Sequence, residues 1–70
     1  MDKFTITVNG KFVTPSGQLS DEYPDACLFT SHKRALWAAE RVCMEPKFEG
    51  AQVTIHENYG MESSSEYEVN

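Results

Sequence analysis

The sequence lacks a long hydrophobic run, a basic charge excess and a dense set of cysteines, and each absence excludes a class of protein. No stretch of the chain approaches the roughly 20 apolar residues of a membrane-spanning helix, so no membrane partner is expected. The opening residues alternate apolar and polar side chains without the apolar core of a signal peptide, which predicts a cytoplasmic protein. Cys27 and Cys43 are then expected as small, buried thiols rather than as a disulfide.

Basic residues are scarce, with six Lys and Arg against eleven Asp and Glu and a net charge of −5. That balance opposes general nucleic-acid binding, which depends on a positive field around the phosphates. A length of 70 residues allows one domain over residues 1–70, with a thin core and little room for a deep substrate cleft. We therefore expect a small binding protein that makes no direct contact with nucleic acid.

Groups able to carry chemistry are few. Cys27, His32, Cys43 and His56 form the one set that could hold a metal, and their spacing matches no common zinc motif. A Cys–His pair could be drawn from the same set, but nothing supplies an orienting third group or a phosphate-binding glycine loop. The sequence therefore predicts no enzyme, no catalytic residue, no metal site and no cofactor, and it predicts that His56 is simply exposed on a strand.

A hairpin is predicted over residues 3–15. Its first strand alternates inward apolar residues with threonines, and Asn9-Gly10 suits a two-residue turn of type I′. Such a turn would pair Thr7 with Phe12 and place Phe12 on the face opposite the inward residues. A longer loop would reverse that placement, so the register stays open.

The remaining non-helical segments differ in pattern. Residues 16–25 are a loop by composition, and residues 26–30 either add a short strand or lead into the helix. Residues 51–57 alternate like a half-buried strand. The acidic C-terminal segment 58–70 ends either as an edge strand, with its last tyrosine and valine inward and its glutamates outward, or as a disordered tail.

These elements together predict an α+β fold. We expect a small three- or four-stranded, mostly antiparallel sheet in the order ββαβ, in which the C-terminal edge strand is the optional fourth strand. One helix packs on one face of this sheet. The open edges leave both a monomer and a homodimer available.

The helix is predicted over residues 31–44. Ser31 supplies the N-cap oxygen, the following residues contain no Gly or Pro, and Pro46 ends the helix. Successive helical residues lie about 100° apart, which collects small and apolar side chains on one arc that can lie close to the sheet. This core arc consists of Ala35, Leu36, Ala38, Ala39, Val42 and Cys43.

The opposite face of the helix centres on Trp37, the one tryptophan of the chain. Lys33, Arg34, Arg41 and Met44 lie at contact spacings around it. An exposed tryptophan, and basic residues in the first helical turn, break common rules of helix composition, and such violations often mark functional sites. Three explanations stand: a loop, the tail or arginine stems shelter Trp37, Trp37 anchors a protein interface, or the basic end binds an anion or nucleic acid.

The acidic residues come from two loops and the tail. If those segments converge, they form a negative surface able to dock on a basic groove of a nucleic-acid enzyme; otherwise they are ordinary solvated acids. The residues concerned are Asp21, Glu22, Asp25, Glu57, Glu62, Glu66 and Glu68.

A resemblance to a known group of proteins rests on the order of elements. A strand hairpin is followed by Thr30-Ser31-x-x-x-Ala35-x-x-x-Ala39 at the start of a helix, and then by Phe48-x-Gly50 before Val53-Thr54-Ile55. Over residues 26–57 this pattern resembles small, acidic inhibitors encoded by bacteriophages, including anti-CRISPR proteins. The resemblance implies a stoichiometric inhibitor that occludes a larger nucleic-acid-handling complex or enzyme of the host, and it carries over no site residues.

The sequence thus leads to a protein-binding inhibitor or modulator whose contact residues are Lys33, Arg34, Trp37, Arg41 and Met44. The alternatives are a nucleic-acid-directed accessory protein that uses the basic helix face, and a housekeeping domain with no strong partner.

Overall fold

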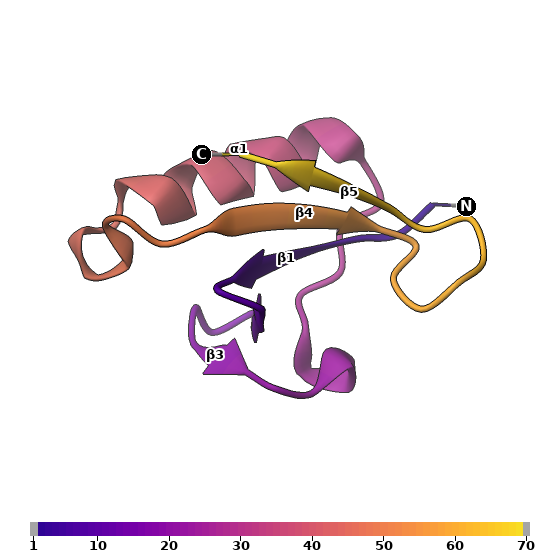
Figure 1. The fold of residues 1–70 in the computed structure, drawn as a ribbon, viewed down its shortest axis with the longest axis horizontal. Coiled ribbons are helices and arrows are strands. Elements are labelled where there is room, and N and C mark those ends of the chain that lie inside the picture. Colours follow the sequence, from indigo (N-terminus) through magenta and orange to yellow (C-terminus); the bar gives the residue numbers. More distant parts are fainter. Residues whose placement is uncertain (1, 70) are drawn as a thin grey trace.

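A five-stranded antiparallel sheet with one long helix on one face forms the molecule (Figure 1). The computed structural model describes residues 2–69, so the predicted positions 1 and 70 lie outside the described residues. The strand order is β3-β2-β1-β4-β5. The elements are β1 (Phe4–Val8), β2 (Lys11–Val13), β3 (Leu19–Ser20), η1 (Tyr23–Asp25), α1 (His32–Met44), η2 (Pro46–Phe48), β4 (Val53–Glu57) and β5 (Ser65–Glu68).

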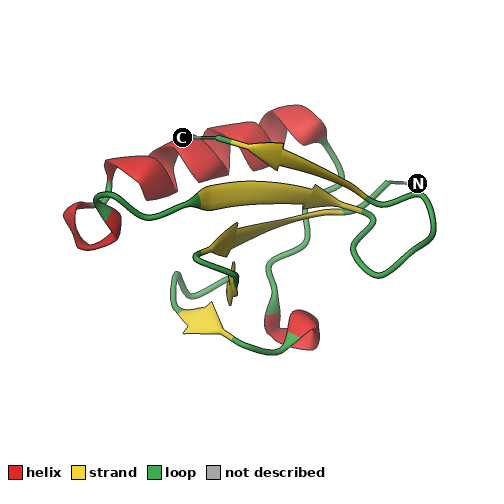
Figure 2. Cartoon of the chain, viewed as in Figure 1, coloured by secondary structure: helices red, strands yellow, loops and turns green. Residues whose placement is uncertain are grey.

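The predicted α+β class, the antiparallel sheet and the helix on one face are confirmed, and the sheet has one strand more than the largest number expected. In Figure 2 the helix runs beside the longer strands, while the short strands and η1 lie on the other side of β1. No helix in the part of the chain that the structure describes is long and apolar enough to cross a membrane.

The first hairpin closes through the two-residue turn. Asn9 and Gly10 have φ angles of 52° and 85°, both in the left-handed region that a type I′ turn requires. Thr7 pairs with Phe12 as a result. Because paired residues of an antiparallel ladder point to the same face, the Phe12 side chain lies on the face away from α1.

The main core lies between α1 and the two central strands. Ile6 of β1 pairs with Ile55 of β4, and both are almost fully buried. Ala35 and Ala39 of α1 have no exposed surface, so the helix backbone lies close to the sheet. The other members of the predicted core arc are partly buried against the same cluster: Leu36, Ala38, Val42 and Cys43.

The predicted loop 16–25 is wrong in part, because it contains β3 and η1. Strand β3 is only two residues long and pairs with β2, so its formation depends on a neighbour that local composition does not reveal. The segment 26–30 leads into the helix: Phe29 exchanges two backbone hydrogen bonds with Phe4, of 2.7 and 2.9 Å, as a single bridge.

The C-terminal segment forms the edge strand and not a disordered tail over its described part. Strand β5 pairs with β4 in antiparallel register. The Tyr67 ring lies 5.1 Å from the His32 ring on the helix side, and Val69 packs against the core. Glu66 and Glu68 alternate to the opposite face, as expected for an edge strand with outward glutamates.

Candidate functional site

The predicted helix face is exposed. Helix α1 begins after Ser31, whose hydroxyl accepts a hydrogen bond from the Arg34 backbone N–H at 3.5 Å. Trp37 is 55% exposed and Met44 is 80% exposed, so neither a loop nor the C-terminal strand covers them. We call the surface formed by Lys33, Arg34, Trp37, Arg41 and Met44 the helix face.

Positive charge surrounds the indole of Trp37. Lys33 Nζ lies 5.1 Å from the centre of the ring, within the range of a cation–π contact. Arg34 and Arg41 line a shallow hollow of about 390 Å³ together with Trp37, and Phe29 and Ala38 complete its lining. Within residues 2–69 none of these cations forms an ion pair. Their charge is therefore available to an outside partner.

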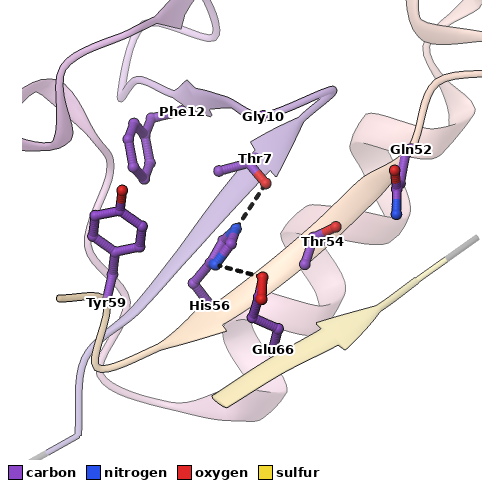
Figure 3. A pocket seen from close by; sticks show the side chains of 8 residues that line it. All are labelled: Thr7, Gly10, Phe12, Gln52, Thr54, His56, Tyr59 and Glu66. Atoms are coloured by element: carbon purple, nitrogen blue, oxygen red, sulfur yellow. Dashed lines mark hydrogen bonds and ion pairs between the residues drawn. The ribbon is translucent and has the colours of Figure 1, made fainter. Parts of the chain in front are cut away.

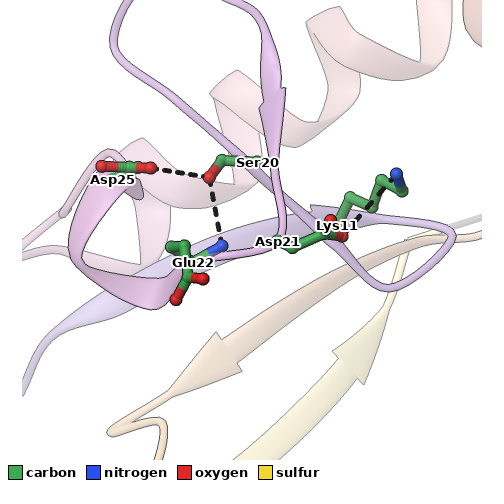
Figure 4. Close-up of polar contacts among 5 residues, drawn as sticks. All are labelled: Lys11, Ser20, Asp21, Glu22 and Asp25. Atoms are coloured by element: carbon green, nitrogen blue, oxygen red, sulfur yellow. Dashed lines mark hydrogen bonds and ion pairs between the residues drawn. The ribbon is translucent and has the colours of Figure 1, made fainter.

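The acidic residues do not form one surface, so of the two alternatives for this set the convergence of all seven into one negative surface does not hold. Asp21, next to β3, lies 3.6 Å from Lys11 Nζ, and Asp25 accepts a hydrogen bond of 2.7 Å from the Ser20 hydroxyl (Figure 4). The same hydroxyl accepts from the Glu22 backbone N–H. These three acids thus lie at the β3 edge of the sheet.

The other acids lie at the opposite edge and on both faces. Glu57 is on the helix side and accepts a hydrogen bond of 2.8 Å from the Tyr67 hydroxyl. Glu66 and Glu68 are on the face away from α1, and Glu62 is exposed in the loop before β5. Of these four acids, Glu66 and Glu68 lie together on one surface.

The sheet face away from α1 carries an aromatic cluster that the sequence did not predict. Phe12 is only 5% exposed, because Tyr23 of η1 and Tyr59 of the loop 58–64 cover it. The two tyrosine rings stack on each other with centroids 5.0 Å apart and planes 26° apart. Two loops far apart in the sequence therefore meet over the sheet, and a second small core results.

His56 lies next to this cluster, and the prediction that it is simply exposed is wrong. Its side chain is 14% exposed; Nε2 lies 2.9 Å from the Thr7 hydroxyl and Nδ1 lies 3.6 Å from Glu66 Oε1 (Figure 3). Burial lowers the pKa of His56, and the charge of Glu66 opposes this only in part. The Thr7 hydroxyl and His56 Nε2 share a hydrogen bond in either neutral tautomer of the ring, and the tautomer determines which of the two donates.

A hollow of about 310 Å³ opens between the aromatic cluster and β5. We call it the open-face hollow. Figure 3 shows His56 and Glu66 turned toward each other at its centre, with Phe12 and Tyr59 on one side. Its lining residues are Thr7, Gly10, Phe12, Gln52, Thr54, His56, Tyr59 and Glu66.

One signal in the sequence could have indicated this site. The two-residue turn already placed Phe12 on the face away from the helix, and an aromatic ring there needs a cover. Tyr23 and Tyr59 were the aromatic residues available in otherwise polar loops. The turn did not show that both loops fold over the same strand pair.

The candidate metal set is dispersed. His32 contacts Phe4 and Tyr67 rings on the helix side of the sheet, whereas His56 lies on the opposite face. Cys43 packs against the main core, and it and Cys27 are free thiols. No group of three or more His, Cys, Asp and Glu side chains in residues 2–69 is arranged to hold a metal ion.

No protein-family model, no curated protein and no solved structure matches this chain. Its two exposed features, the helix face and the open-face hollow, are therefore interpreted from their own chemistry.

Proposed function

We propose that this protein is a binding inhibitor or modulator that docks through the helix face onto an acidic surface of a larger protein in the cytoplasm. The observation that carries the proposal is the exposed indole of Trp37 beside Lys33, Arg34 and Arg41, none of which forms an ion pair within residues 2–69. Tryptophan and arginine are the residues in which interface binding energy most often concentrates.

The chemistry of the partner follows from this surface. The exposed side of the indole is hydrated, so it contributes binding free energy only if a partner removes that water. The partner therefore needs a cleft of apolar side chains to receive the indole. Arg34 and Arg41 stand beside it and can each form a forked pair with a carboxylate. We therefore expect an apolar cleft with carboxylates on its rim.

A protein partner is favoured over nucleic acid by the charge distribution. The chain carries a net charge of −5, and the acids of β5 and of the β3 edge lie outside the helix face. A phosphate backbone would meet this negative field beyond the small basic patch, whereas a compact protein epitope would not.

The test compares Trp37→Ala with Met61→Ala, which removes a similarly exposed apolar side chain away from α1. The wild-type chain is used to capture its partner, and the affinity of each variant for that partner is then measured by calorimetry. Trp37→Ala should cost at least about 2 kcal/mol of binding free energy, whereas Met61→Ala should cost little. Both variants should unfold within about 0.5 kcal/mol of the wild type, because surface substitutions have small effects.

Charge reversal provides the second arm. Arg34→Glu should weaken the binding of the partner. Lys3→Glu makes the same charge change outside the helix face and should leave the affinity unchanged. If Trp37→Ala lowered the melting temperature and left affinity for the captured protein unchanged, the indole would be a structural element and the proposal would be wrong.

A further inference from the structure

We propose that the open-face hollow is a binding site for a guanidinium group, either on the arginine side chain of a protein or on a small free molecule. This inference is separate from the proposed function, because the hollow and the helix face lie on opposite sides of the sheet.

The charge of the hollow is negative and not neutralised from within. The Glu66 carboxylate faces the hollow, and its side chain remains 65% exposed. No Lys or Arg side chain of the described residues lines the hollow. Glu68 lies on the same face, next along β5. A cation entering the hollow therefore meets the Glu66 carboxylate, with Glu68 on the same face, and no competing Lys or Arg.

The hydrogen-bonding groups of the hollow match a ligand that only donates. Gln52 uses its amide N–H to bind Glu68 at 2.8 Å, which leaves its carbonyl oxygen as an acceptor. Thr7 shares a hydrogen bond with His56 Nε2, and its hydroxyl oxygen keeps at least one lone pair free whichever of the two donates. A guanidinium has five N–H donors and no acceptor, so its needs are complementary to these groups.

The shape and aromatic content favour a guanidinium over an ammonium. Tyr59 is 43% exposed and borders the hollow together with the Phe12 ring. A flat guanidinium stacks on aromatic rings and can also fork onto the Glu66 carboxylate, whereas an ammonium is a compact, strongly hydrated charge. Because Phe12 is covered, Tyr59 is the accessible aromatic ring, and its juxtaposition with the Glu66 carboxylate favours the planar cation.

The position of His56 makes the site sensitive to acid. The titratable groups that face its ring are Glu66 from β5 and Tyr59 from the loop before it; β1 and β2 contribute the uncharged Thr7 and Phe12. A protonated His56 would place a positive charge beside Glu66 and compete with the ligand. Binding is therefore expected to weaken as the pH falls.

The experiment is a titration followed by amide NMR, with N-acetyl-arginine amide as the probe. N-acetyl-citrulline amide is the matched neutral control, because it has nearly the same shape without the charge. The arginine probe should shift the resonances of Gly10, Gln52, His56 and Tyr59, and the citrulline probe should bind about tenfold more weakly or not at all.

Variants separate the local carboxylate from general charge attraction. Glu66→Gln should weaken arginine binding about tenfold or more, since a hydrogen bond to a charged group is lost. Glu62→Gln removes the same charge from an exposed position outside the hollow and should change affinity less than about twofold. Thr54→Val removes a lining hydroxyl and is the second variant within the hollow. The amide spectrum of each variant confirms that it is folded.

One further probe identifies the source of the group. A glycine–serine peptide that contains one arginine should bind more tightly than the free probe if a protein supplies the side chain, and equal affinity assigns a small molecule. Equal binding of citrulline and arginine, or equal losses for Glu66→Gln and Glu62→Gln, would overturn the proposal. Because neither variant touches α1, loss of arginine binding with retained partner capture would leave the proposed function intact.

Discussion

At the scale of single residues, His56 is an ionisable side chain that is held mostly out of water. It is held between Thr7, Glu66 and two aromatic rings, and its burial outweighs the effect of the neighbouring carboxylate. Trp37 is the contrary case, a large apolar side chain left in water. One face of the molecule therefore buries a polar ring, and the other exposes an apolar one.

The lowered pKa of His56 makes the free energy of unfolding depend on pH. The unfolded chain binds a proton near the ordinary value of 6.5, whereas the folded chain binds it only at lower pH. This contribution to stability is complete above that value and is lost as the pH falls through 6.5 toward the folded pKa. Urea unfolding at a series of pH values should therefore show a decline on the acid side that His56→Gln reduces.

His32→Gln is the matched control for that experiment. It removes the other imidazole of the chain, which contacts Phe4 and Tyr67 on the helix side, and leaves His56 in place. The acid decline should persist in this variant. An unchanged decline in His56→Gln would show that other groups cause the pH dependence.

At the scale of elements, α1 depends on small side chains to lie close to the sheet. Ala39 is fully buried against the central strands. Ala39→Leu should therefore destabilise the protein by about 1–3 kcal/mol, because a larger side chain must displace the helix or its neighbours. Chemical denaturation measures the change.

Glu40→Leu introduces the same leucine one position later, on the exposed side of the helix. It should alter the free energy of unfolding by no more than about 0.5 kcal/mol. If both variants were equally stable, the contact between α1 and the sheet would be looser than the burial of Ala39 indicates.

The elements that the sequence predicted are those specified by neighbouring residues. Asn9-Gly10 determines the turn of the first hairpin, and the spacing of Ala35 and Ala39 determines the buried side of α1. Strand β3 was missed because its two residues form a strand only through pairing with β2. Local composition contains no information on such a partner.

The helix face could be predicted from the local sequence, whereas the open-face hollow could not. The helix face could be derived because one helical period places Lys33, Trp37 and Arg41 together. The open-face hollow forms only if the loop that contains Tyr59 folds back over the sheet and if β5 pairs with β4, which brings Glu66 to the hollow. The local sequence determines neither of these two contacts. Sites whose residues come together only through tertiary contacts could therefore not be predicted from the sequence.

At the scale of the whole molecule, the sheet separates two small cores that share their central strands. The inward residues of β1 and β4 pack under α1, and the outward residues of the same strands lie beside the aromatic cluster. Because each core is thin, neither is expected to survive loss of the other. The molecule should unfold as one unit.

Phe12→Leu tests this coupling. Shortening the side chain that both tyrosines cover should cost about 1–2 kcal/mol, less than the 3–5 kcal/mol typical of a full truncation to alanine. Thermal unfolding followed by tyrosine fluorescence and by helical circular dichroism should shift by the same amount. Separate midpoints for the two probes would show that the aromatic cluster melts independently of α1.

Strand β1 occupies the centre of the sheet although it lies near the start of the chain, and this arrangement affects synthesis on the ribosome. Its long partner β4, and the helix that covers its inner face, are translated much later. A two-stranded hairpin alone is barely stable in water, so the nascent hairpin cannot hold its fold until Glu57 has left the exit tunnel. During that interval Phe4, Ile6 and Val8 lack the cover that β4 and α1 give them in the folded chain, and exposed apolar segments of this kind are prone to aggregation.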